Sequence, residues 1–160
     1  MKQKTKIPVK IELEKTNFRD MRVLYIKDKA PTTEAIKDIL AKGYDELMKY
    51  VKGHGLKTTK FMAWYNSMKP PWDIEVAIET ESLNAQLSGR ILSRIVTGGE
   101  VVIAHMRGPY DQVGHAYEMI QNWLKENNHK ARGNPFEVYI YDPAKVKTAA
   151  EIQTEIYQPI

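Results

Sequence analysis

The sequence carries the same predicted order of elements twice, namely a strand, a helix and two strands, within 160 residues. The segment KFMAWYNSMKP of the first half has the position of NPFEVYIYDP in the second, and WDIEVAIE has that of IQTEIYQP. Two copies with a period of roughly 75 residues predict two halves related by a pseudo-two-fold axis rather than a solenoid. The predicted elements are a strand at 21–26, a helix within 34–52 and strands at 60–66 and 72–79, then a strand at 99–106, a helix within 110–126 and strands within 133–143 and at 152–158.

The repeat predicts an α+β fold with an antiparallel sheet. Each half is expected to lay the apolar side of its helix on the sheet, because neither element can bury that surface alone. The segment 83–97 joins the halves and is expected to add a strand at about 90–96. We therefore expect one domain over 1–160, with halves at about 11–82 and 90–160. Both helices should lie on one face of the sheet, and a ligand cleft on the other.

Alternation along the strands assigns side chains to the two faces, since successive residues of a strand point to opposite sides. The apolar set is expected to face the helices: Ile74, Val76, Val138, Ile140 and Ile156. The second set is rich in acids and aromatic rings and is expected to line the cleft: Met62, Trp64, Asp73, Glu75, Glu137, Tyr139, Tyr141, Glu155 and Tyr157.

This second set has a plausible chemical use. An aromatic ring attracts a cation through its quadrupole, by about 0.5–2 kcal/mol for a well-placed ring. A partly desolvated carboxylate adds a charge-assisted contact. Such a cleft would prefer flat, hydrophobic, positively charged molecules. However, Tyr and Trp are common in strands for propensity alone, so the residue types by themselves leave a plain solvated face open.

Composition excludes several other classes of protein. There is no cysteine, which removes disulfides and thiolate chemistry. No apolar run of about 18 residues predicts a membrane span, and the lysine-rich N-terminus lacks the apolar stretch of a secretory signal, so a cytoplasmic location is expected. The net charge of +4 comes from scattered lysines, which favour a solvated surface over a nucleic-acid site. No metal or other cofactor is expected, because the histidines lack metal-ligand spacing: His54, His105, His115 and His129.

Three runs in the second half resemble one family. HMRGPYDQVGHAYEMIQNWLKENN, NPFEVYIYDP and TEIYQPI, in this order, are similar to the GyrI-like small-molecule-binding domains, the effector-binding domains of multidrug-responsive regulators such as BmrR and Rob. The resemblance spans about Ile11 to Ile160 and is most specific in the second half. It implies a ligand cleft between the halves with a central acid, which corresponds to Glu137. The aromatic neighbours that it implies are Tyr110, Tyr139, Tyr157 and, from the more variable half, Trp64.

The resemblance also frames the possible functions. Regulators of this family carry a DNA-binding module, and about ten residues ahead of the domain are too few for one. A stand-alone form without direct DNA binding is therefore expected. The favoured function is binding of hydrophobic, often cationic, small molecules for sensing, sequestration or protection against toxins. One alternative is a hydrolase of strained electrophilic toxins, with Glu137 as general base and Tyr110 or Tyr139 as hydrogen-bond donor. Another is a protein inhibitor of a topoisomerase.

Overall fold

The computed structural model describes residues 9–67, 69–81, 86–140 and 152–160. Short 3-10 turns, Thr33–Ala35 and Tyr110–Gln112, precede the two helices. Within these ranges, no helix is both long and apolar enough to span a membrane. The elements are β1 (Lys10–Phe18), β2 (Met21–Ala30), α1 (Ile36–Gly53), β3 (Thr58–Tyr65), β4 (Trp72–Thr80), β5 (Leu92–Val96), β6 (Gly99–Arg107), α2 (Val113–Glu126), β7 (Phe136–Tyr139) and β8 (Gln153–Pro159).

The strands form one antiparallel sheet in the order β1-β6-β8-β7-β3-β4-β2-β5. The repeated unit is confirmed as β2-α1-β3-β4 and β6-α2-β7-β8, and β7 pairs with β3 at the centre of the sheet. Each edge strand pairs with the other half, β1 with β6 and β5 with β2. β5 lies within the predicted extra strand, whereas β1 was not predicted.

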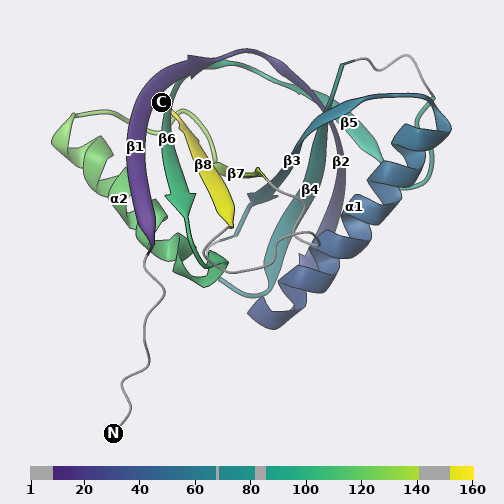
Figure 1. The fold of residues 1–160 in the computed structure, drawn as a ribbon, viewed down its shortest axis with the longest axis horizontal. Coiled ribbons are helices and arrows are strands. Elements are labelled where there is room, and N and C mark those ends of the chain that lie inside the picture. The colour runs from purple at the N-terminus through teal and green to yellow at the C-terminus, as the bar shows by residue number, and fades with distance from the viewer. Residues whose placement is uncertain (1–8, 68, 82–85, 141–151) are drawn as a thin grey trace, which may run out of the picture.

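One side of the sheet, here called the inner face, is concave. A single apolar cluster on this face joins Met21 and Val23 of β2 to Val101 and Ile103 of β6, although four strands separate β2 from β6 in the sheet. The cluster continues across the strands between them, and the sheet curls around it, as Figure 1 shows. The central strands are therefore covered on this side by apolar residues, not by water.

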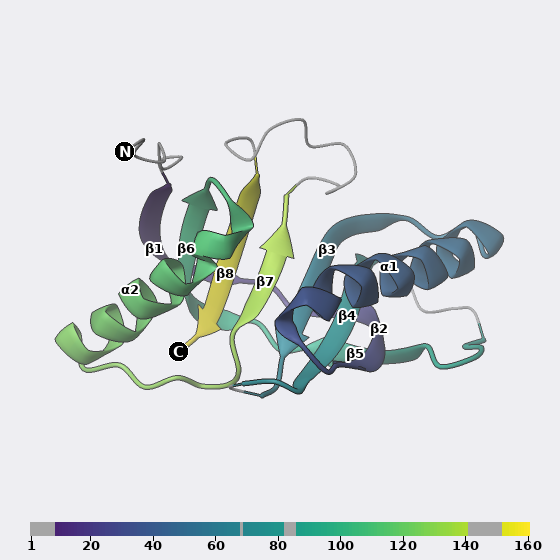
Figure 2. The ribbon, with the colours of Figure 1, turned by 90° about the horizontal axis from the view of Figure 1, so that it is seen from below.

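The opposite side, here called the helix face, carries both helices, as predicted. α1 packs on β2 and β4, and α2 packs on β6 and β8, in two separate apolar clusters. Figure 2 shows β7 and β3 between the two helices. Two assignments were wrong: Val138 packs in the inner-face cluster, and Ile140, just after β7, is exposed and packs under neither helix. The reason is that both faces of β7 are buried, so an apolar side chain there does not indicate the helix side.

A close backbone crossing closes one end of the curl. The link from β1 to β2 passes the link from β5 to β6, where the Gly98 amide donates to the Asp20 carboxylate at 2.7 Å. A Cβ atom at Gly98 would lie 2.2 Å from the carbonyl oxygen of Phe18. The crossing therefore needs glycine at this position, and it holds the two ends of the sheet together.

A matched pair of glycine substitutions tests how tightly α1 seats on the sheet. A Cβ at Gly43 would come within 2.8 Å of the Val76 side chain, whereas one at Gly114 in α2 would meet nothing within 4 Å. Alanine favours an isolated helix by about 1 kcal/mol over glycine. We expect Gly114→Ala to stabilise the protein by up to about 1 kcal/mol and Gly43→Ala to destabilise it by about 1–3 kcal/mol through overpacking. Urea unfolding of both variants measures this, and a gain for Gly43→Ala would contradict the close packing.

Candidate functional site

Glu137 lies at the centre of the helix face, in a row of aliphatic residues that crosses the sheet. Its direct cross-strand neighbours are Ile156 on β8 and Ala63 on β3. The row continues to Ala104 on one side and Val76 on the other. The Glu137 side chain is 2% exposed. A buried carboxylate in an aliphatic row is costly unless other groups bond to it.

Tyrosine hydroxyls supply those bonds. Tyr110, in the turn before α2, donates to Oε1 of Glu137 at 2.5 Å, and Tyr139 of β7 donates to the same oxygen at 2.8 Å. Tyr117 of α2 donates to Oε2 at 2.6 Å. The three donors come from three elements, namely β7, the turn before α2 and α2 itself, and together they hold both carboxylate oxygens in place.

Two further tyrosines extend this cluster towards α1. The Tyr65 hydroxyl on β3 lies 3.1 Å from that of Tyr110 and 3.2 Å from that of Tyr139. Tyr44 of α1 donates to the Met62 carbonyl at 2.7 Å. We call Glu137 with Tyr44, Tyr65, Tyr110, Tyr117 and Tyr139 the tyrosine cluster. It includes five of the nine tyrosines of the chain and bridges both helices.

The charge of Glu137 has no counterion in the described part of the chain. None of the ion pairs there includes it. Burial raises the pKa of Glu137 above its ordinary value, and the hydrogen bonds from Tyr110, Tyr117 and Tyr139 only partly oppose this. The pKa values of these tyrosines are raised as well, first by burial and then by the nearby carboxylate. The hydroxyls therefore stay protonated and serve as neutral donors.

One buried hydroxyl beside the cluster lacks a partner. Thr154 lies opposite Tyr139 on β8 and is fully buried, and its Oγ1 has no hydrogen-bond partner among the described residues. Buried polar atoms without partners are uncommon and call for an explanation.

The sequence placed Glu137 and Tyr139 on the face opposite the helices, and this was wrong. Their hydrogen bonds reach Tyr117 in α2, so they lie on the helix face. The strand registers place the other described residues of the predicted set on the inner face. None of them lies in the cross-strand row of Glu137, and each alternates with a residue of that row: Met62, Trp64, Asp73, Glu75, Glu155 and Tyr157. Tyr141 lies outside the described residues.

On the inner face, Arg94 of the protein itself contacts Glu75 and Trp64, an acid and a ring that were predicted to bind a ligand cation. The Arg94 guanidinium lies 4.6 Å from the ring centroids of both Trp64 and Tyr25. Its Nη1 donates to Glu75 at 2.5 Å, and Asn66 donates to the other oxygen of the same carboxylate. The sequence identified a real cation-binding arrangement here, but the cation is internal.

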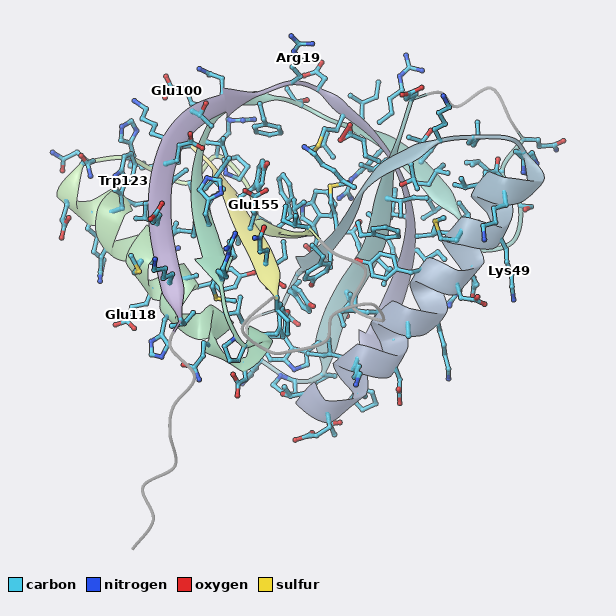
Figure 3. All side chains as sticks on the ribbon, in the orientation of Figure 1. Arg19, Lys49, Glu100, Glu118, Trp123 and Glu155 are labelled. Carbon is cyan, nitrogen blue, oxygen red and sulfur yellow. The ribbon has the colours of Figure 1, made fainter. Side chains whose placement is uncertain are left out.

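The other inner-face residues also have partners within the protein. Glu155 is 18% exposed and pairs with Nδ1 of His105, while Nε2 of the same ring lies 3.0 Å from Glu14. Tyr157 stacks on Phe136 with 5.0 Å between ring centroids, and burial raises its pKa to about 12. Figure 3 shows Glu155 inside the curl of the sheet and Glu118 outside it, on α2.

The two remaining predicted residues differ in environment. Asp73 is exposed and pairs with Lys29 at 3.7 Å, whereas Met62 is fully buried in the apolar cluster. Among the described residues, no group of three or more acidic or histidine side chains could hold a metal ion.

The sequence missed three members of the tyrosine cluster. Tyr44, Tyr65 and Tyr117 were not among the predicted site residues. One signal was available for Tyr117: it follows Tyr110 by seven residues, about two helical turns, a spacing that could have placed both rings on one side of the helical segment. For Tyr44 and Tyr65 the hydroxyl contacts depend on the pairing of β3 with β7, which local patterns do not reveal.

A neutral substitution tests the cost of burying the Glu137 charge. A pKa raised in the folded state contributes stability that is present below the unfolded value, about 4.3, and is lost as pH rises through the raised value. Glu137→Gln has no ionisable group at this position and does not lose this stability. As the pH is raised from 4 to 8, we expect the unfolding free energy of the variant to increase by about 1 kcal/mol relative to that of the unsubstituted protein.

Urea unfolding at both pH values measures the difference. Glu118→Gln, an exposed change on α2, serves as the matched control and should show no such pH dependence. A relative loss for Glu137→Gln on raising the pH would mean that the tyrosines more than offset the burial of the charge.

Comparisons with known proteins add to this geometry. No curated protein matches the sequence. Among solved structures, EcmrR in a DNA complex has a TM-score of 0.83 at 21% identity, covering 93% of this chain and 57% of that one. The EcmrR C-terminal domain has 0.76 at 19% identity, covering 93% and 96%. A hydrolase from Listeria innocua has 0.66 at 14% identity, covering 92% and 91%.

These identities establish a shared fold and no more. This chain spans 57% of the length of EcmrR in the DNA complex. The match to a family is more direct, because the model for the GyrI-like small molecule binding domain covers residues 11–160. The chain therefore belongs to the family of GyrI-like small molecule binding domains.

Proposed function

We propose that this domain binds hydrophobic, positively charged small molecules at the tyrosine cluster, with Glu137 as the charge partner. The observation that carries the proposal is the carboxylate of Glu137, which is 2% exposed and forms no ion pair among the described residues. A buried charge normally has a partner of opposite sign. A cationic ligand would supply that partner.

The aromatic rings fit the same class of ligand. Tyr44, Tyr65, Tyr110 and Tyr117 are only partly buried, so their rings contribute accessible surface around a buried acid. Ring faces attract cations and stack on flat molecules without strict directional demands. Recognition of this kind tolerates ligands of different shape, as a sensor or a sequestering protein requires.

The hydrogen bonds of Glu137 suggest how affinity depends on its ionisation. Three tyrosine donors stabilise the carboxylate form, whereas burial favours the neutral acid and raises the pKa. A ligand cation adds a further term that favours the carboxylate. Binding of a cation should therefore ionise Glu137, and affinity should increase as pH rises through the raised pKa.

Titration with a matched pair of dyes, one permanently cationic and one neutral, tests the role of the charge. We expect Glu137→Gln to weaken cationic-dye binding by about 1–3 kcal/mol, the scale of a hydrogen bond to a charged group. The neutral dye should be little affected. Fluorescence titrations from pH 4 to pH 8 should show affinity for the cation rising with pH in the unsubstituted protein and staying flat in the variant.

A ring-to-hydroxyl comparison separates the tyrosine contributions. Tyr117→Phe keeps the ring and removes one donor to Oε2, so it should lower affinity less than Glu137→Gln does. Equal losses for the cationic and the neutral dye in Glu137→Gln would show that the residue supplies shape rather than charge.

Hydrolysis of a reactive electrophile is the second candidate. A carboxylate with a raised pKa, next to neutral tyrosine donors, has the features of a general base beside a group that stabilises an oxyanion. One protein of similar fold, from Listeria innocua, is a hydrolase. Mass spectrometry of a strained cyclopropane substrate decides between the two: turnover lost in Glu137→Gln supports catalysis, and binding without turnover supports the first proposal.

A further inference from the structure

We propose a second binding site, on the inner face, for a small aromatic molecule that carries a negative charge. A cavity of about 240 Å³ lies where the ends of β3, β5 and β8 meet the segment before β7. The lining residues that matter here are Trp64, Arg94, Arg132, Asn134, Phe136 and Pro159. The cavity is on the opposite side of the sheet from Glu137 and shares no residue with the tyrosine cluster.

The charges at this cavity are of one sign. Its charged lining residues are Arg94 and Arg132, and no Asp or Glu among the described residues lines it. Glu75, the partner of Arg94 through Nη1, is not part of the lining. Two guanidinium groups facing one small space suit a carboxylate, sulfonate or phosphate, whose oxygens match the planar fork of N–H donors.

Arg94 is held in place before any ligand binds. Its guanidinium lies 4.6 Å from the ring centroids of both Tyr25 and Trp64, and Nη1 is bonded to Glu75. The contacts described for this side chain use Nη1 alone, whereas a guanidinium has five N–H donors. An arginine fixed in this way loses little conformational entropy when its other donors bind an anion.

Arg132 has donors to spare as well, and a glycine gives it room. Its described side-chain contact is a long bond of 3.3 Å from Nε to the Ile160 carbonyl. The guanidinium lies against Gly99, where a Cβ atom would come within 3.0 Å of Nη2. A larger residue at position 99 would displace the guanidinium from the edge of the cavity.

The cavity wall determines the rest of the ligand. Trp64 stacks on Phe136 with 4.6 Å between centroids, and Phe136 stacks on Tyr157 at 5.0 Å. A flat ring that enters beside Trp64 and Phe136 would add to apolar and aromatic contacts already present. The volume is below the 300 Å³ or more that is usual for drug-sized ligands. The site therefore fits one aromatic ring with one acidic group.

Three ligands of nearly the same shape and different charge test the site. They are benzoate, benzamide and benzamidine, titrated into the full chain while protein amide and indole signals are followed by NMR. We expect benzoate to bind about tenfold more tightly than neutral benzamide, as a charge-assisted contact requires. Cationic benzamidine should not perturb the Trp64 indole signal.

Substitutions then locate the binding. Arg132→Ala should weaken benzoate by about threefold, the scale of a partly exposed ion pair, and Arg132→Lys should recover part of the loss. Arg94→Lys keeps a charge beside Glu75 but removes the fork, and should also weaken benzoate. Arg107→Ala, at the other end of β6, is the matched control and should have no effect. Glu137→Gln, which tests the proposed function, should leave benzoate affinity unchanged.

Several results would overturn the site. They are equal affinities for benzoate and benzamide, equal losses in Arg132→Ala and Arg107→Ala, or no benzoate binding up to tens of millimolar. Loss of benzoate binding in Glu137→Gln would place the anion at the tyrosine cluster instead. Failure of the cationic dyes to bind, with benzoate binding intact, would reject the proposed function and leave this site standing.

Discussion

The buried carboxylate of Glu137 is the constraint around which the helix face is arranged. It lies on the central pair of strands, where each half of the repeat contributes one, and its hydrogen-bond donors come from β7, the turn before α2 and α2 itself. The bond to Oε2 requires α2 to be packed in one rotation about its own axis, because only then does the Tyr117 hydroxyl reach this oxygen. Tyr65 extends the same hydroxyl network to β3. The hydroxyl network around the acid therefore depends on the relative placement of the two halves.

The curl of the sheet explains why both faces of the central strands are buried. All four residues of β7 are buried, so alternation there does not separate core from solvent. Glu137 and Tyr139 face the helices while Phe136 packs in the inner cluster with Val138. From the sequence, the element order, the antiparallel sheet and the same-side helices could all be predicted, since periodicity and an internal repeat report on them directly. Which side of a doubly buried strand faces the helices depends on long-range curvature, and the sequence carried no local signal for it.

The candidate site was predicted unevenly for the same reason. Glu137, Tyr110 and Tyr139 were identified as a group, and the structure brings them into direct contact. Glu155 and Glu75 shared their residue type and repeat position, yet they pair with His105 and Arg94 inside the curl. The difference is the presence of an internal cation. A pattern of acids and rings indicates where a cation is held, but it does not tell whether the cation belongs to the protein or to a ligand.

The two proposed sites differ in the charge of the groups that line them. On the helix face a carboxylate is surrounded by neutral hydroxyls with no cation among the described residues, while on the inner face the cavity beside Trp64 has two guanidinium groups and no acid in its lining. Only one sheet separates the two proposed sites, and Ala63 and Trp64 of β3 point to opposite faces of it. A single small molecule with a cationic and an anionic end could not reach both, because the hydrogen-bonded strands lie between them. If both proposals hold, the two sites take separate ligands, and β3, which pairs with β7, is the element that would couple them.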